Sequence, residues 1–119
     1  MEKIEPKISV EYTENATVAT LTGERILEEP DIVSLGDSIL PLVEQNDRIN
    51  LVIDFCNVKF LSSAVLGLLI RISKKIYESD GQLKLCGINP KILKIFKITR
   101  LNRVFDIYPD KDGALKSFN

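Results

Sequence analysis

Two adjacent serines, Ser62 and Ser63, lie between an apolar run with the character of a strand and a longer apolar run with helical spacing, in "NVKFLSSAVLGLLIRISKKIY". A serine hydroxyl just before a helix can cap its first turn, and a serine activated by a neighbouring base can act as a nucleophile. Capping accounts for one of the two hydroxyls and leaves the other unexplained.

A helix that begins near Ser63 distinguishes the two hydroxyls. At about 100° per residue, Ser63 lies at the edge of a polar face with Gly67 and Arg71, whereas Ser62 points towards the apolar side. That apolar side is formed by Val65, Leu66, Leu68, Leu69, Ile70, Ile72 and Ile76. A glycine at an exposed helix position costs about 1 kcal/mol relative to alanine. We therefore expect Ser63 to be the more accessible hydroxyl and Gly67 to permit the close approach of another chain.

The other residue types argue against an enzyme. The sequence has no histidine for acid–base work, no glycine-rich phosphate loop of the Walker type, and no recognisable base beside either serine. Its two cysteines, Cys56 and Cys86, are interpreted as reduced, buried, small hydrophobic residues. Two isolated thiols without histidine do not complete an ordinary zinc site, so we expect neither a metal nor a cofactor.

One segment combines several cations with no acidic residue: Lys84, Lys91, Lys94, Lys97, Arg100 and Arg103. The spacing of its central lysines places them on one helix face, which could contact phosphates. A solvated face, or a docking patch for an acidic protein, fits better because no aromatic residues interleave to stack on bases. The formal net charge of −1 also gives no overall attraction to polyanions, so we expect no binding to nucleic acid.

The order of apolar patterns predicts an α/β fold. Alternating runs at 8–12 and 17–21 predict a hairpin or a pair of edge strands. Helical spacing from residue 30 predicts a helix with a kink, or in two pieces, near residues 37–41, where Pro41 lies. A buried central strand at 49–54 precedes a long helix at about 63–79. Four elements follow: a strand at 82–86, a helix from Pro90 capped by Asn89, a short strand in "RVFDIY" and a short C-terminal helix. This alternation predicts one domain with a mixed, mostly parallel sheet flanked by helices.

Chain length indicates the number of domains, and the apolar runs indicate the location of the protein. A chain of 119 residues is a single domain by length. The N-terminus has no secretory signal pattern, and the longest apolar run, from Ala64 to Ile70, is far too short to span a bilayer. We therefore expect a cytoplasmic protein that does not bind membranes.

The region from residue 8 to residue 108 resembles a STAS domain of the bacterial anti-sigma factor antagonist class. The resemblance rests on Asp54 at a strand end, on Ser62-Ser63 followed by Leu66-Gly67, on Gly81, and on "ITRLNRVF". It implies that residues 1–119 form a single STAS domain. It also implies phosphorylation of the second serine of the pair, Ser63, with Ser62 as the alternative. The partner-binding residues expected on this basis are Ser62, Ser63, Ala64, Gly67, Arg71, Glu24 and Asp54. For Glu24 and Asp54, solvation of a strand end is an equally good interpretation.

In this family the unphosphorylated protein binds an anti-sigma factor with a serine kinase fold, which frees a sigma factor for transcription. Phosphorylation reverses the binding and a separate phosphatase resets the switch, so the resemblance implies the same cycle here. Leu61 replaces the acidic residue usual before the serine pair, and Ala64 replaces the usual glycine after it. These differences leave open an alternative: a STAS module that is not phosphorylated and binds a small ligand or scaffolds a signalling complex.

Overall fold

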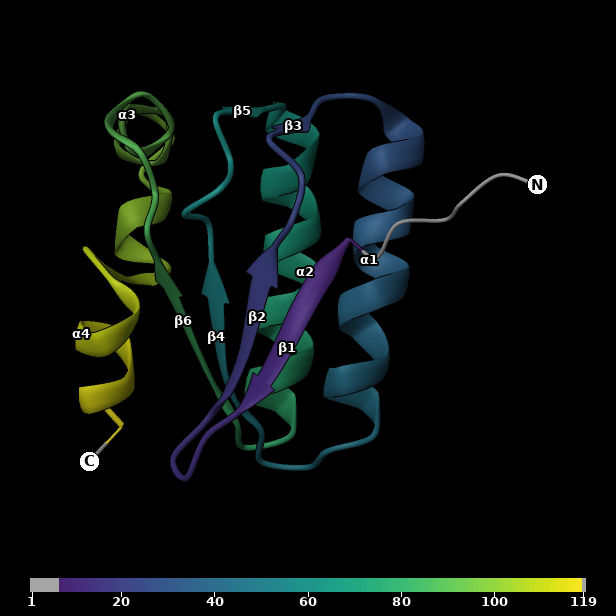
Figure 1. Ribbon diagram of the computed structural model, residues 1–119, viewed down its shortest axis with the longest axis vertical. Helices are drawn as coiled ribbons and strands as arrows, with labels where there is room; N and C mark the ends of the chain where they lie inside the picture. The colour runs from purple at the N-terminus through teal and green to yellow at the C-terminus, as the bar shows by residue number, and fades with distance from the viewer. Residues whose placement is uncertain (1–6, 119) are drawn as a thin grey trace.

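The structure is a computed structural model that describes residues 7–118 (Figure 1). In chain order its elements are β1 (Ile8–Tyr12), β2 (Thr17–Leu21), β3 (Arg25–Ile26), α1 (Glu29–Glu44), β4 (Asn50–Asp54), β5 (Phe60–Leu61), α2 (Ser63–Glu78), β6 (Gln82–Cys86), α3 (Pro90–Ile98), the 3-10 helix η1 (Leu101–Arg103), β7 (Asp106–Tyr108) and α4 (Lys111–Lys116).

The main sheet has the strand order β1-β2-β4-β6-β7. The pair β1–β2 is antiparallel, and the pairs β2–β4, β4–β6 and β6–β7 are parallel. The central strand β4 buries Leu51, Val52 and Ile53 completely. The predicted mixed, mostly parallel sheet is therefore confirmed.

Helices cover both faces of this sheet. Successive strand residues point to opposite faces, so Leu51 and Ile53 pack with α1 and α2, whereas Val52 packs with Ala114 of α4. Figure 1 shows α1 and α2 side by side along one face, with α3 beside the carboxyl end of β6. The N-terminus of α2 lies at that same end of the sheet.

Three features of the fold correct the sequence interpretation. The helix α1 is continuous through Pro41, so a helix in two pieces is wrong. The carbonyl that loses its donor belongs to Asp37, which is exposed, and water can replace the missing N–H there. The short parallel pair β3–β5, above the main sheet, was not predicted, because two-residue strands show no periodicity. Ile70 was assigned to the apolar side of α2 but is 44% exposed.

Lys84 does not belong to the exposed basic segment. It is only 6% exposed, and its Nζ lies 3.5 Å from Asp106 Oδ2 and against the rings of Tyr108 and Phe118. Its position on β6 directs the Lys84 side chain to the face of the sheet that α4 covers. There the alkyl stem is buried and the ammonium is paired. The basic surface of this region therefore consists of the residues from Lys91 onwards.

Candidate functional site

The short pair β3–β5 positions the two serines. Arg25 and Ile26 pair with Phe60 and Leu61, and the Ser62 amide donates to the Ile26 carbonyl at 3.0 Å. Ser62 is extended (φ −85°, ψ 158°), and α2 begins at the next residue. The start of α2 is thus held at the carboxyl end of the main sheet.

The two hydroxyls have different environments. Ser63 is exposed at the first residue of α2, as expected from the helix phase. The Ser62 Oγ is buried, has no hydrogen-bond partner among the described residues, and makes no capping bond. Capping by a serine side chain, the simplest interpretation of the pair, is therefore wrong for this helix.

A groove of about 720 Å³ runs between α1 and α2 and includes both serines. Its α2 wall is formed by Ser62, Ser63, Ala64, Gly67, Leu68 and Arg71, and its α1 side by Leu27, Glu29, Ile32, Val33, Gly36, Asp37 and Leu40. Five of the seven predicted partner-binding residues, Ser62, Ser63, Ala64, Gly67 and Arg71, therefore line one concave surface.

Two helical glycines shape this groove in opposite ways. A Cβ placed on Gly67 would meet no atom within 4 Å, so this position is open to an incoming chain. A Cβ placed on Gly36 would lie 3.2 Å from Leu68 Cδ1, so this glycine lets α1 approach α2 closely. Sequence reasoning missed Gly36 and the rest of the α1 wall. A glycine inside the helical pattern of residues 29–44 was the available signal, since such glycines often mark close packing.

The groove combines an apolar surface with charges of both signs at its edges. Arg71 lies on the α2 side, and Glu29 and Asp37 lie on the α1 side. Among residues 7–118, no salt bridge joins Arg71 to an acidic residue, and no cluster of His, Cys, Asp or Glu side chains could hold a metal ion. A concave apolar surface with few charges is suited to binding.

Glu24 and Asp54 do not line the groove. The Glu24 carbonyl accepts the amides of Lys59 and Phe60, and its exposed carboxylate lies 3.5 Å from Lys59 Nζ. Asp54 is 7% exposed and its Oδ1 accepts the Cys56 amide at 3.0 Å. Glu24 thus holds β5 in place, and Asp54 fixes the turn after β4 instead of being solvated at the strand end.

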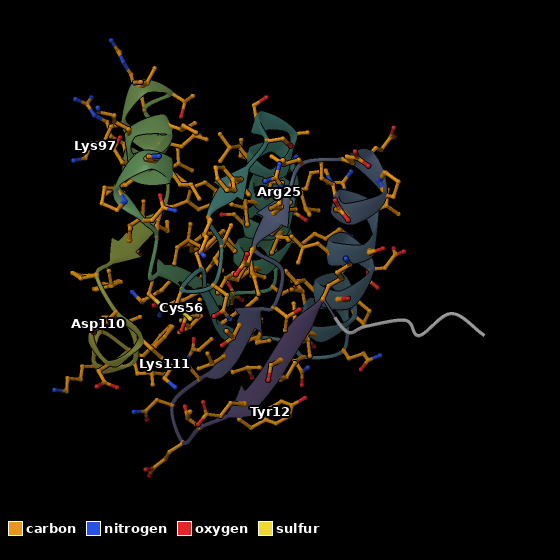
Figure 2. The ribbon with its side chains drawn as sticks, turned by 45° about the horizontal axis from the view of Figure 1, so that its top comes forward. Tyr12, Arg25, Cys56, Lys97, Asp110 and Lys111 are labelled. Atoms are coloured by element: carbon orange, nitrogen blue, oxygen red, sulfur yellow. The ribbon has the colours of Figure 1, made fainter. Side chains whose placement is uncertain are left out.

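The two thiols lie on either side of Asp54 and differ in exposure. Cys86 is buried as expected, whereas Cys56 is exposed, because the turn after Asp54 carries it to the surface near α4 (Figure 2). Burial, with a further contribution from the Asp54 charge, raises the pKa of Cys86 to about 12. The same two causes raise the pKa of Cys56. Both thiols are therefore poor nucleophiles at neutral pH.

None of the helices within residues 7–118 has the length and apolar character needed to cross a membrane.

Comparisons with known proteins agree with this architecture. The family model for the STAS domain matches residues 7–114. The anti-sigma-B factor antagonist of Bacillus subtilis (strain 168) is 24% identical over 109 residues, covering 92% of this chain and 96% of the relative. A STAS domain protein from Planctomyces limnophilus, an anti-sigma-factor antagonist, superposes with a TM-score of 0.86 at 24% identity, covering 98% of this chain and all of the other.

A third similar structure is that of the Bacillus cell fate determinant SpoIIAA in its phosphorylated form. It has a TM-score of 0.70 at 18% identity and covers 94% of this chain and 99% of its own. At these identities the structural matches establish the fold, while the family model covers most of the described chain. The chain therefore belongs to the STAS domain family.

Proposed function

We propose that the chain is an anti-sigma factor antagonist whose unphosphorylated form binds an anti-sigma factor with a serine kinase fold through the α1–α2 groove. Phosphorylation of Ser63 releases that partner, and a separate phosphatase restores the binding form. The observation that carries this proposal is the exposed Ser63 at the start of α2, on the edge of a groove with an open position at Gly67. Curated relatives named as anti-sigma factor antagonists support it.

The switch follows from electrostatics at the start of α2. A phosphate adds a charge of about −1.5 to −2 at neutral pH, and the N-terminus of a helix tolerates negative charge. The folded protein therefore accepts the modification without unfolding. A partner packed over Ser63 and Gly67 would bury that charge beside Glu29 and Asp37 on the facing wall, which is costly.

The proposal assigns no enzymatic activity, nucleotide or metal to this chain, since ATP and magnesium belong to the kinase. Because the cycle needs a kinase and ATP, we expect it to take place in the cytoplasm. The whole chain acts as one STAS domain.

Incubation of the protein with the anti-sigma factor kinase of the same organism and ATP tests the proposal directly. Intact mass should rise by one phosphate in the native protein and in Ser62→Ala, and stay unchanged in Ser63→Ala. If the modification is lost in Ser62→Ala and kept in Ser63→Ala, the phosphorylated residue is Ser62 instead.

Binding measurements test the second half of the cycle. Ser63→Ala should bind the partner and resist release. Ser63→Asp should weaken binding by about 2 to 5 kcal/mol if the charge becomes buried and unpaired. The phosphorylated protein should show a larger effect, because aspartate carries less charge than phosphate.

A module that is not phosphorylated remains a second candidate, and the groove itself favours it. A volume of about 720 Å³ with an apolar surface is within the range of small-molecule sites. Absence of modification at both serines, together with binding of a small ligand that shifts the amide signals of Gly36 and Gly67, would support this function over the switch.

A further inference from the structure

The α3–η1 region presents a cationic surface that the groove does not include. The α3–η1 basic patch consists of Lys91, Lys94, Lys97, Arg100 and Arg103, which are all exposed. No acidic residue occurs between positions 87 and 105, and no salt bridge among residues 7–118 involves the patch. In Figure 2 the side chain of Lys97 points away from the body of the protein.

Packing of α3 forces these cations outward. Ile92 and Phe96 are buried, and the Phe96 ring meets Phe105 edge-on at a centroid distance of 6.0 Å. The Asn89 side chain accepts the Ile92 amide at 2.9 Å, which fixes the start of the helix. The apolar face of α3 is thus used by the core, and its outer face is left to the lysines.

Helix stability does not account for the patch. A cation near the carboxyl end of a helix is favourable by about 0.3 to 1 kcal/mol, which explains Lys97. Lys91 lies in the first turn, where the same field opposes positive charge. Arg100 adopts the left-handed conformation (φ 63°), which glycine would adopt with less strain. Local structure therefore favours Lys97 but gives no reason for a cation at Lys91 or for a side chain at Arg100.

We propose that the α3–η1 basic patch binds a short acidic segment of the same protein partner that docks on the α1–α2 groove. This inference rests on the proposed function. The Asn89 side chain donates to the carbonyls of Val58 and Lys59 at 3.1 and 3.3 Å, which ties the start of α3 to the segment that leads into β5 and Ser62. Figure 1 shows α3 and the start of α2 at the same end of the sheet. Since α2 begins at Ser63, one partner can reach both the patch and this serine.

Charge distribution favours a short acidic segment over a long polyanion. Without the five cations of the patch, the chain holds 11 basic and 17 acidic residues, a net charge of −6. Nucleic acid extends beyond a local contact and would be repelled by this remainder. Its bases would also find no stacking platform, because Phe96 and Phe105 are buried.

A membrane surface fits the patch less well than an acidic protein segment. Interfacial helices insert a continuous apolar face that carries large side chains. In α3 that face is packed into the core, and only Ile98 and Val104, at 77% and 56% exposure, interrupt the cations. Two separate aliphatic side chains give little insertion, whereas a protein segment can contact both the cations and these side chains.

The test compares two double variants that remove the same charge. Lys94→Gln/Lys97→Gln removes two of the five positive charges of the patch, and Arg48→Gln/Lys116→Gln removes two positive charges outside it. The second variant is the matched control, since both of its residues are exposed. Association with the anti-sigma factor is measured at low and at physiological ionic strength, with thermal unfolding as a check on folding. A short polyglutamate peptide, a DNA duplex and phosphatidylserine-containing vesicles serve as separate probes.

The patch variant should associate about five- to tenfold more slowly than the control at low salt, with a smaller difference at physiological salt. Polyglutamate should shift the amide signals of residues 91–103 in the native protein, and higher peptide concentrations should be needed for the same shifts in the patch variant. Equal association rates for both variants would overturn the inference while leaving the groove function intact. Stronger binding to DNA or vesicles than to polyglutamate would also overturn it. Failure of the partner to bind any form, with the peptide still bound at the patch, would instead count against the proposed function.

Discussion

We expect Gly67→Ala to change stability and partner binding in opposite directions. The fold should become more stable, and binding of the partner should weaken. The residue is exposed in the interior of α2, and an added Cβ would meet no atom within 4 Å. Alanine is favoured over glycine in a helix interior by about 0.8 to 1 kcal/mol. With no clash to subtract, the free energy of unfolding should rise by about that amount, and Tm by about 4 °C.

Gly36→Ala is the matched control, because it makes the same substitution inside the facing helix. Here the new Cβ would lie 3.2 Å from Leu68 Cδ1, at a buried position between α1 and α2. The gain in helix propensity is then offset by the displacement of Leu68, so Gly36→Ala should be neutral or destabilising. Urea unfolding followed by circular dichroism measures both variants, and an unchanged m-value shows that the comparison concerns stability.

The same pair of variants tests the groove as an interface. Gly67→Ala should weaken partner binding although it stabilises the fold, because the added methyl occupies space that a closely packed chain would need. A destabilised Gly67→Ala would refute the helix phase and the open position. A stabilised variant with unchanged partner affinity would remove Gly67 from the interface.

Four further predictions concern the core, the helix starts and the thiols. Leu69→Ala should cost about 2 to 5 kcal/mol of stability, measured by urea unfolding, because Leu69 is fully buried; a loss below 1 kcal/mol would contradict its core position. Ser62→Ala should cost less than the roughly 1 kcal/mol of an ordinary cap, because its hydroxyl makes no hydrogen bond within residues 7–118. Asn89→Ala should cost about 1 to 2 kcal/mol, because its side chain accepts the Ile92 amide, and equal losses for the two variants would contradict this difference. A thiol reagent in excess should modify Cys56 slowly in the folded protein, because this thiol is exposed but has a raised pKa, and should modify Cys86 only after unfolding. Because folding raises the pKa of Cys86 from 9.0 to about 12, the unfolded chain releases this proton first, so stability should fall as pH rises through that window, less so in Cys86→Ala.

Local patterns in the sequence were sufficient for the longer elements and for the accessible serine, but not for the two-residue strands β3 and β5. Alternation specified the hairpin, and the continuous apolar run specified the central strand β4. The spacing in α2 distinguished Ser63 from Ser62, since the phase of a helix follows from its own apolar residues. Asn89 and Pro90 marked the start of α3 by capping chemistry that acts within one turn.

Tertiary structure alone decided which residues share a surface. The α1 wall of the groove, with Gly36 against Leu68, results from the packing of two helices that are separated in sequence by β4 and β5. The outward turn that exposes Cys56 depends on the buried Asp54, and the burial of Lys84 depends on α4, which comes later in the chain. These arrangements depend on contacts between distant segments, and the periodicity of a single segment carries no information about them.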